Sequence, residues 1–174
     1  MRAQGDSVRA ANEKRYLKSD FVHIGVPVPA LRKVAVSAVK TTPTRDELLA
    51  LAEKVVGRLV VRHPDLGSVL DAWVADPYMW VRRAAVLALL AGIRNGSPDL
   101  VRIDKFGDAL IGEREFFIRK ALGWVLRELS KKDPGWVARW VEPRVEVISG
   151  VTLREAVRWL PEEDAGRLRA TQRR

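Results

Sequence analysis

One predicted helix, REFFIRKALGWVLREL from Arg114 to Leu129, carries an aromatic ring among basic side chains. At about 100° per residue, Trp124 lies beside Lys120 and Arg127, next to Gly123 and at the edge of the apolar arc. An indole ring edged by two cations can pack on nucleotides while the cations hold phosphates. The alternative is an amphipathic tryptophan that bridges two structural repeats, with its N–H toward water.

A second group of aromatic and basic residues supports the same chemistry. Trp80 and Arg83 are three positions apart and therefore share a helical face. Arg83 stands in an apolar sequence, where its charge needs an anionic partner, either an internal carboxylate or a DNA phosphate. Arg154 extends the basic character toward the C-terminal end, close to Trp159. The candidate DNA-binding residues from this pattern are Trp80, Arg83, Lys120, Trp124, Arg127 and Arg154.

Other site chemistries find little support in the sequence. The two histidines, His23 and His63, are far apart and show no ligand spacing, so we expect no metal site. His63 precedes a proline and is most simply a residue at a helix end. There is no glycine-rich phosphate loop and no G-x-S-x-G motif. A site that binds a polyanion remains the best-supported kind.

The composition agrees with a polyanionic partner. The net charge is +9 and the isoelectric point is about 10.3, which suggests nucleic acid or a membrane surface. The alternative is an arginine-rich, solvated surface. Cysteine is absent, which excludes disulfides and thiolate metal sites. The N-terminus lacks the apolar region of a secretory signal, and no apolar run approaches the roughly 20 residues of a spanning helix. We therefore expect a cytoplasmic protein outside the membrane.

Helical periodicity dominates the whole chain, and no segment alternates with a period of two. Asp76-Pro77, Pro98-Asp99 and Asp133-Pro134 have the residue types of helix starts. The predicted helices are Ser7–Ser19, Val28–Lys40, Arg45–His63, Leu66–Ala75, Met79–Arg94, Leu100–Gly112, Arg114–Lys131, Pro134–Glu146, Thr152–Leu160 and Pro161–Thr171. The sequence predicts an all-α fold.

Three segments share a repeated pattern: PYMWVRRAAVLAL, EFFIRKALGWVL and SGVTLREAVRWL. Each has an apolar residue, then basic character, then alanine. Ile118 follows Val81 by about 37 positions, and Leu153 follows Ile118 by about 35, which is typical of paired-helix repeats. The D…VR arrangement around Asp76 resembles a HEAT repeat. Stacked pairs bury faces that one pair cannot bury alone, so a HEAT-like solenoid is favoured over an irregular bundle.

Longer stretches resemble a known family. EFFIRKALGWVLRELSKKDPGWV and SGVTLREAVRWLP resemble the C-terminal half of the DNA alkylation repair proteins, the AlkD-type DNA glycosylases built from HEAT-like repeats. RYLKSDFVHIGVPVPALRKV, from Arg15 to Val34, resembles their N-terminal signature. RHPDLGSVLDAWVADPYMWVRRAAVLAL, from Arg62 to Leu89, resembles their middle. Together these stretches cover most of the 174 residues.

The resemblance implies a basic concave groove that binds double-stranded DNA. It also implies excision of cationic N3- or N7-alkylated purines in base excision repair, without a metal or organic cofactor. By the same resemblance, Trp124 packs against the DNA backbone near the lesion and Arg83 contacts that backbone. Tyr16 lines the same region. A monomer is expected.

The chain departs from the family pattern in its middle. The family has a further helical unit, with a tryptophan and a catalytic aspartate, ahead of the helix that matches Lys54–His63. Here, a single repeat domain, 1–174, has an apparent deletion near 41–55. The aspartate position falls on Leu49 and the tryptophan position on Arg45.

Two functional hypotheses follow for DNA. Either the chain is an active or weakened glycosylase, or it is a DNA-binding helical-repeat protein that has lost catalysis. We predict salt-sensitive DNA binding with weak or no glycosylase activity. A third hypothesis is a scaffold whose basic face binds an acidic protein.

Overall fold

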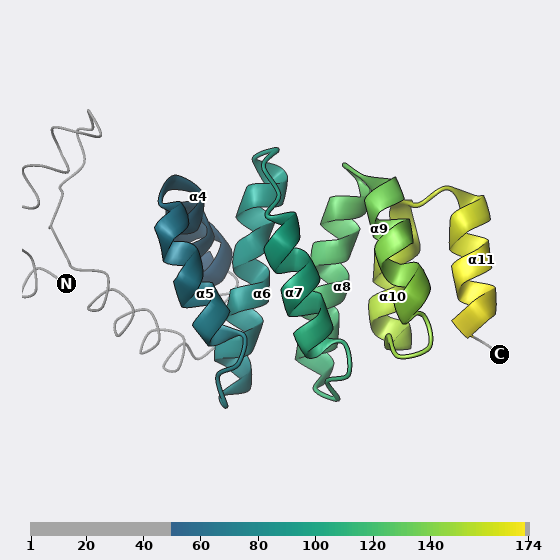
Figure 1. The fold of residues 1–174 in the computed structure, drawn as a ribbon, viewed down its shortest axis with the longest axis horizontal. Coiled ribbons are helices and arrows are strands. Elements are labelled where there is room, and N and C mark those ends of the chain that lie inside the picture. Colours follow the sequence, from purple (N-terminus) through teal and green to yellow (C-terminus); the bar gives the residue numbers. More distant parts are fainter. Residues whose placement is uncertain (1–49, 173–174) are drawn as a thin grey trace, which may run out of the picture. The chain divides into compact units, whose positions relative to one another are not determined.

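The computed structural model describes residues 50–172, which all belong to one compact unit of the chain, Pro43–Arg174. Every regular element within that range is a helix (Figure 1). None of the helices in 50–172 combines the length and the apolar character needed to cross a bilayer. The predicted helices Ser7–Ser19 and Val28–Lys40 lie outside the described residues.

The described helices follow one another along the chain with short connections. They are η2 Ala50–Gly57, α4 Arg58–Arg62, η3 Pro64–Leu66, α5 Gly67–Trp73, α6 Met79–Arg94, α7 Leu100–Leu110, α8 Phe116–Ser130, α9 Pro134–Val141, η4 Glu142–Arg144, α10 Gly150–Ala156, η5 Val157–Trp159 and α11 Glu162–Gln172. The element η2 is a π-helix, and η3, η4 and η5 are 3-10 turns. The predicted bounds of α6 are confirmed at both ends.

Several predicted helices are shorter than expected, and Arg45–His63, Pro134–Glu146 and Thr152–Leu160 also change helix type within their predicted ranges. Pro134–Glu146 was predicted as one helix, but α9 ends at Val141 and a 3-10 turn follows. Pro143 lacks the N–H that an α-helix would use there, which explains the change. From residue 50, the predicted helix Arg45–His63 divides into π-helical η2 and the α-helix α4, and His63 is the C-terminal cap.

Aspartates begin the helices much as their residue types predict. Asp99 accepts a hydrogen bond from the Arg102 backbone N–H at 3.0 Å, and Asp133 accepts one from Trp136 at 2.8 Å. Each bond satisfies a donor that the first helical turn leaves unpaired. Asp76 differs, because it accepts from the Tyr78 N–H and closes the turn before α6 rather than capping the helix.

The helices form two layers that are built from repeated pairs (Figure 1). The front layer consists of α5, α7 and α9, and the back layer consists of α6, α8 and α10, with α8 packed between α6 and α10. The shared positions of the three sequence repeats point into the core. The residues at these positions are Val81, Ile118 and Leu153, then Ala84, Ala121 and Ala156, and all six are buried. The predicted helical-repeat solenoid is confirmed.

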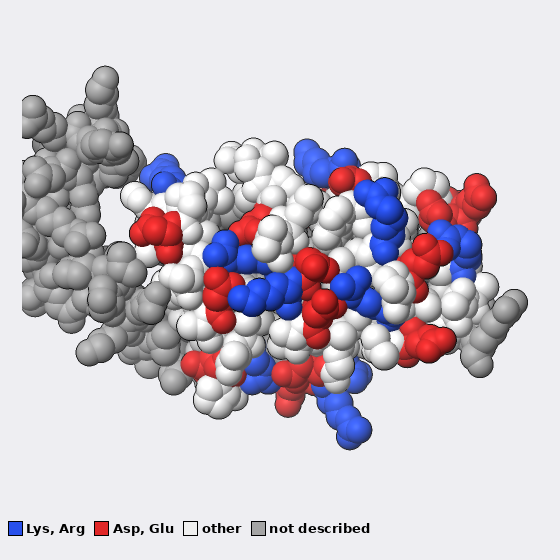
Figure 2. Space-filling model, viewed as in Figure 1, with Lys and Arg blue, Asp and Glu red and all other residues white. Residues whose placement is uncertain are grey.

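Ion pairs connect successive elements across the front layer. Arg102 of α7 reaches back to Asp71 of α5 at 3.0 Å. Arg144 of η4 reaches back to Asp104 at 3.1 Å and to Asp108 of α7 at 2.7 Å. Figure 2 shows the resulting alternation of acidic and basic side chains on this face. Because these charges neutralise one another, the front face is a poor candidate for binding a polyanion.

The Asp71 pairs make a testable contribution to stability in acid. Burial raises the pKa of Asp71, but hydrogen bonds and charges from Arg102 and Lys105 outweigh it and lower the pKa overall. The stabilisation that the ionised Asp71 gives to the folded state is therefore fully present above the unfolded-state pKa. It is lost as the pH falls through the lower pKa of the folded state. We expect Asp71→Asn to reduce the free energy of unfolding at pH 7 by up to about 1 kcal/mol.

Urea denaturation at pH 7, 5 and 3 measures this difference, which should shrink toward the acid end. Asp65→Asn is the matched control, since that exposed carboxylate makes no ion pair within residues 50–172. If the difference in the free energy of unfolding between the unmodified chain and Asp71→Asn grew below pH 4, it would contradict the lowered pKa of Asp71.

Candidate nucleic-acid interface

Trp124 lies on the back layer between cations from two helices. Its side chain is half-buried on α8. The guanidinium carbon of Arg127, three residues along the same helix, is 5.8 Å from the ring centroid. That of Arg94, from the end of α6, is 6.0 Å away. Both distances are at the outer limit of a cation–π contact. The predicted Trp124–Arg127 neighbourhood is confirmed, and Arg94 is a contact that the sequence did not reveal.

Lys120 points elsewhere. Its ammonium is 5.9 Å from the centroid of the exposed Phe116 ring, near the start of α8. Lys120 makes no ion pair with any described residue, and its side chain is half-buried. It therefore contributes positive charge near one end of α8, rather than beside Trp124 as the helical wheel suggested.

The cations around Trp124 are held by carboxylates from three helices. Arg94 pairs with Glu53 of η2. Arg127 pairs with Glu155 of α10 at 2.7 Å and lies 3.7 Å from Glu128. These pairs link η2 to α6 and α8 to α10 across the back layer. The positive character that sequence reasoning assigned to this face is therefore partly neutralised.

Glu128 is held in its ionised form. Burial alone raises the pKa of its carboxyl, but the hydrogen bond from Lys131 at 2.9 Å and the charges of Lys131, Arg94 and Arg127 lower the pKa overall. The carboxylate is thus negative at neutral pH, and its charge is compensated by these neighbours.

Two donors at Trp124 have no acceptor among the described residues. The indole Nε1 and the Arg127 Nε are both buried and make no hydrogen bond there. A buried donor without an acceptor costs about 1–3 kcal/mol. The alternative interpretation is therefore wrong about the indole N–H, which does not face water, but right that the ring bridges two repeats, since it contacts Arg94 of α6.

Gly123 has a different role from the predicted one. The sequence placed this small residue beside Trp124 with the cations, away from the apolar arc. A Cβ added at Gly123 would lie 3.2 Å from the Thr152 Cα and 3.0 Å from the Glu155 Cβ. Gly123 is buried and lets α10 approach α8 closely. Its effect on the site is indirect, because that approach brings Glu155 to Arg127.

Arg83 is more deeply buried than its predicted contact with DNA suggests. It is fully buried and donates a hydrogen bond to the Phe117 carbonyl oxygen. Its guanidinium carbon is 5.6 Å from the Phe117 ring, which also contacts the Trp80 ring at 5.1 Å. The predicted common face of Trp80 and Arg83 is confirmed. However, this face packs against the start of α8, where the Arg83 side chain is fully buried.

The remaining candidates divide between the surface and the undescribed part of the chain. Arg154 is exposed on α10 and makes no ion pair with a described residue. Trp159 in η5 is 54% exposed, and the Lys131 ammonium is 5.7 Å from its ring centroid. Tyr16, Arg45 and Leu49 lie outside the described residues. No group of three potential metal-binding side chains occurs within residues 50–172.

Comparison with known proteins gives a consistent result. A family described as DNA alkylation repair enzyme matches residues 1–55 and 49–160. The chain is also similar to a solved structure described as a predicted DNA alkylation repair enzyme from Enterococcus faecalis. The two are 21% identical, with a TM-score of 0.57, over 91% of this chain and 98% of that chain. No curated protein matches the sequence.

Proposed function

The chain belongs to the DNA alkylation repair enzyme family, and from this premise we propose that it binds duplex DNA along the back layer. In this proposal the partner is double-stranded DNA rather than a membrane. The chain binds it as a monomer with a single HEAT-like repeat domain. The main observation in support of this proposal is that Trp124 is half-buried and that Arg94 and Arg127 lie against its ring. A sugar or base can pack on the indole while the guanidinium groups bind phosphates.

The distribution of charge supports this choice of face. The chain carries a net charge of +9, while the front layer is neutralised by its own ion pairs. On the back layer, Lys120 and Arg154 make no ion pair with described residues. Unpaired cations near an aromatic ring attract phosphate without requiring a particular base sequence.

The catalytic part of the proposal is that the chain is an impaired glycosylase. Release of an N3- or N7-alkylated purine needs a carboxylate near the sugar to stabilise its developing positive charge. Among described residues, the carboxylates at the Trp124 cluster are Glu53, Glu128 and Glu155, and each is ion-paired. The family matches this chain in two segments that meet at residues 49–55, at the region near 41–55 where the sequence predicts a deletion.

A charge-reversal variant tests the DNA-binding surface. We expect Lys120→Glu to weaken duplex binding about five- to tenfold at about 50 mM salt, because one phosphate contact is replaced by repulsion. The slope of log K against log salt should become shallower by roughly one. Fluorescence anisotropy with a labelled duplex, titrated at several salt concentrations, measures both quantities.

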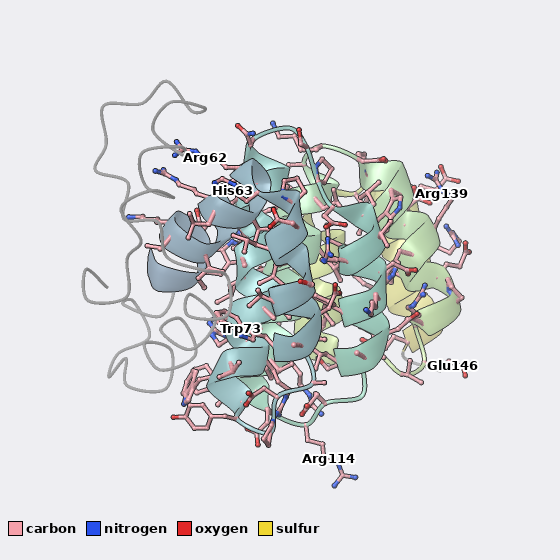
Figure 3. The ribbon with its side chains drawn as sticks, turned by 60° about the vertical axis from the view of Figure 1, so that its left-hand side comes forward. Arg62, His63, Trp73, Arg114, Arg139 and Glu146 are labelled. Atoms are coloured by element: carbon pink, nitrogen blue, oxygen red, sulfur yellow. The ribbon has the colours of Figure 1, made fainter. Side chains whose placement is uncertain are left out.

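The matched control is Arg139→Glu, which makes the same change in net charge on the front-layer helix α9. Arg139 is exposed and lies at the outer edge of α9 (Figure 3). We expect less than a twofold change for this variant. Equal losses from both variants would reduce the interaction to overall charge and would remove support for the back layer.

A further inference from the structure

The contact between a cation and the Trp124 ring has a counterpart one structural repeat further along the chain. Trp159 follows Trp124 by about 35 positions, and Lys131 follows Arg94 by about 37. These are the same steps that separate the shared buried positions of the repeats. The residue at the corresponding position of α6 is Leu87, which is buried, so the described series begins with Trp124.

The geometry of the two arrangements also agrees. In the first, Arg94 at the end of α6 lies 6.0 Å from the centroid of Trp124 on α8. In the second, Lys131 directly after α8 lies 5.7 Å from the centroid of Trp159 in η5, which follows α10. In each case, a cation at the end of one back-layer helix reaches the tryptophan of the next repeat. Equivalent positions in stacked repeats therefore place the same two kinds of group together.

Glu128 connects the cations of the two arrangements. Glu128 pairs with Lys131 at 2.9 Å and lies 3.7 Å from Arg127, which contacts Trp124. A continuous series of charged groups thus connects the two indole rings. Trp159 consequently belongs to the same part of the back layer as the proposed DNA contact.

Exposure distinguishes Trp159 from a core residue. It is 54% exposed, although a ring of this size normally gains stability from burial. Arg154 and Arg158 beside it in the chain are also exposed and make no ion pair with described residues. An exposed aromatic ring with several cations matches the chemistry of a nucleic-acid backbone, whose sugars are apolar and whose phosphates are anionic.

We propose that Lys131 and Trp159 form a second DNA-contact unit, equivalent by repeat to Arg94 and Trp124. Trp159 packs on a sugar or base of the duplex, and Lys131 binds a neighbouring phosphate. This inference rests on the proposed function, because it assumes that duplex DNA occupies the back layer. It extends the contact surface from α8 to η5.

Two variants of this unit test the proposal by duplex-binding anisotropy. Trp159→Ala should weaken binding about five- to fiftyfold, which lies within the roughly 5- to 150-fold loss expected for one stacking aromatic. Trp159→Phe should restore most of the lost affinity. Lys131→Gln should weaken binding several-fold and make the salt slope shallower by about one.

The adjacent Lys132 provides the matched control, since it is exposed and makes no ion pair with a described residue. Lys132→Gln makes the same change in charge and should alter affinity less than twofold. Combined Trp159→Ala and Lys131→Gln should cost less than the two separate losses together, because one unit is removed. Circular dichroism and thermal melting should show an unchanged fold, as both side chains are substantially exposed.

Separate outcomes distinguish the inference from its premise. If the unmodified chain does not bind duplex DNA, the proposed function and this inference both fail. If Lys120→Glu weakens binding but Trp159→Ala binds as the unmodified chain does, only the inference fails, and the exposed ring serves another partner. Equal effects of Lys131→Gln and Lys132→Gln would also overturn it.

Discussion

Arg83→Ala is expected to lower the free energy of unfolding by roughly 3–5 kcal/mol. Arg83 is among the largest fully buried side chains within residues 50–172, and it donates to the Phe117 carbonyl oxygen across the α6–α8 contact. Truncation removes that hydrogen bond and leaves a cavity at the Phe117 ring. Urea denaturation followed by circular dichroism measures the change.

Two further arginine variants make this result interpretable. Arg83→Met keeps most of the volume without the charge, so a smaller loss of about 1–2 kcal/mol is expected. Arg94→Ala on the same helix should cost about 1 kcal/mol or less, since that side chain is 42% exposed. An Arg83→Ala protein that is fully stable but defective in DNA binding would restore the role that the sequence resemblance suggested.

The sequence predicted the helices well where local chemistry determines them. Met79–Arg94 has an uninterrupted apolar pattern, and the observed α6 has the same bounds. Asp99 and Asp133 combine a capping side chain with a helix start, and both caps are present. The repeat spacing gave the layer structure, because identical positions in stacked pairs meet identical surroundings. The division of Arg45–His63 at Gly57 has no comparable local signal.

The candidate site was predicted less completely because it depends on contacts between helices. A helical wheel placed Trp124 correctly at the edge of the apolar arc. It could not show that Arg94, about 30 positions earlier, reaches the same ring. It also treated Gly123 as a surface residue, whereas the close approach of α10 buries it. Arg83 was assigned to a groove for the same reason, since its neighbour Phe117 lies on another helix.

The ion pairs of the two layers have different consequences. In the front layer, arginines bind aspartates of the preceding pair, and the contacts stabilise the stack without an external partner. On the back layer, Arg94 and Arg127 use glutamates from neighbouring helices in the same way. DNA phosphates must therefore compete with those glutamates, so the affinity for duplex DNA should be modest and strongly dependent on salt.

The ion-paired glutamates near Trp124 lead us to expect slow release of alkylated bases. With duplex DNA that contains 7-methylguanine, we expect release to be about 10²–10⁴-fold slower than for a family member with an unpaired carboxylate at the sugar. The 7-methylguanine is already cationic and leaves without a general acid. The missing contribution is therefore the negative charge that stabilises the sugar. Glu53, Glu128 and Glu155 supply little of it, because each is compensated by a neighbouring cation.

Mass spectrometry of the released base, with chelator present and with a protein-free sample for spontaneous depurination, measures the rate. The Glu128→Gln variant should be assayed beside the unmodified chain, because Glu128 is one helical turn from Trp124 and is ionised at neutral pH. If the unmodified chain releases base only at the spontaneous rate, Glu128→Gln should do the same. Rapid, metal-independent release would contradict the prediction of impaired catalysis. Its loss in Glu128→Gln would then identify that carboxylate as the one that acts on the sugar, despite its ion pairs.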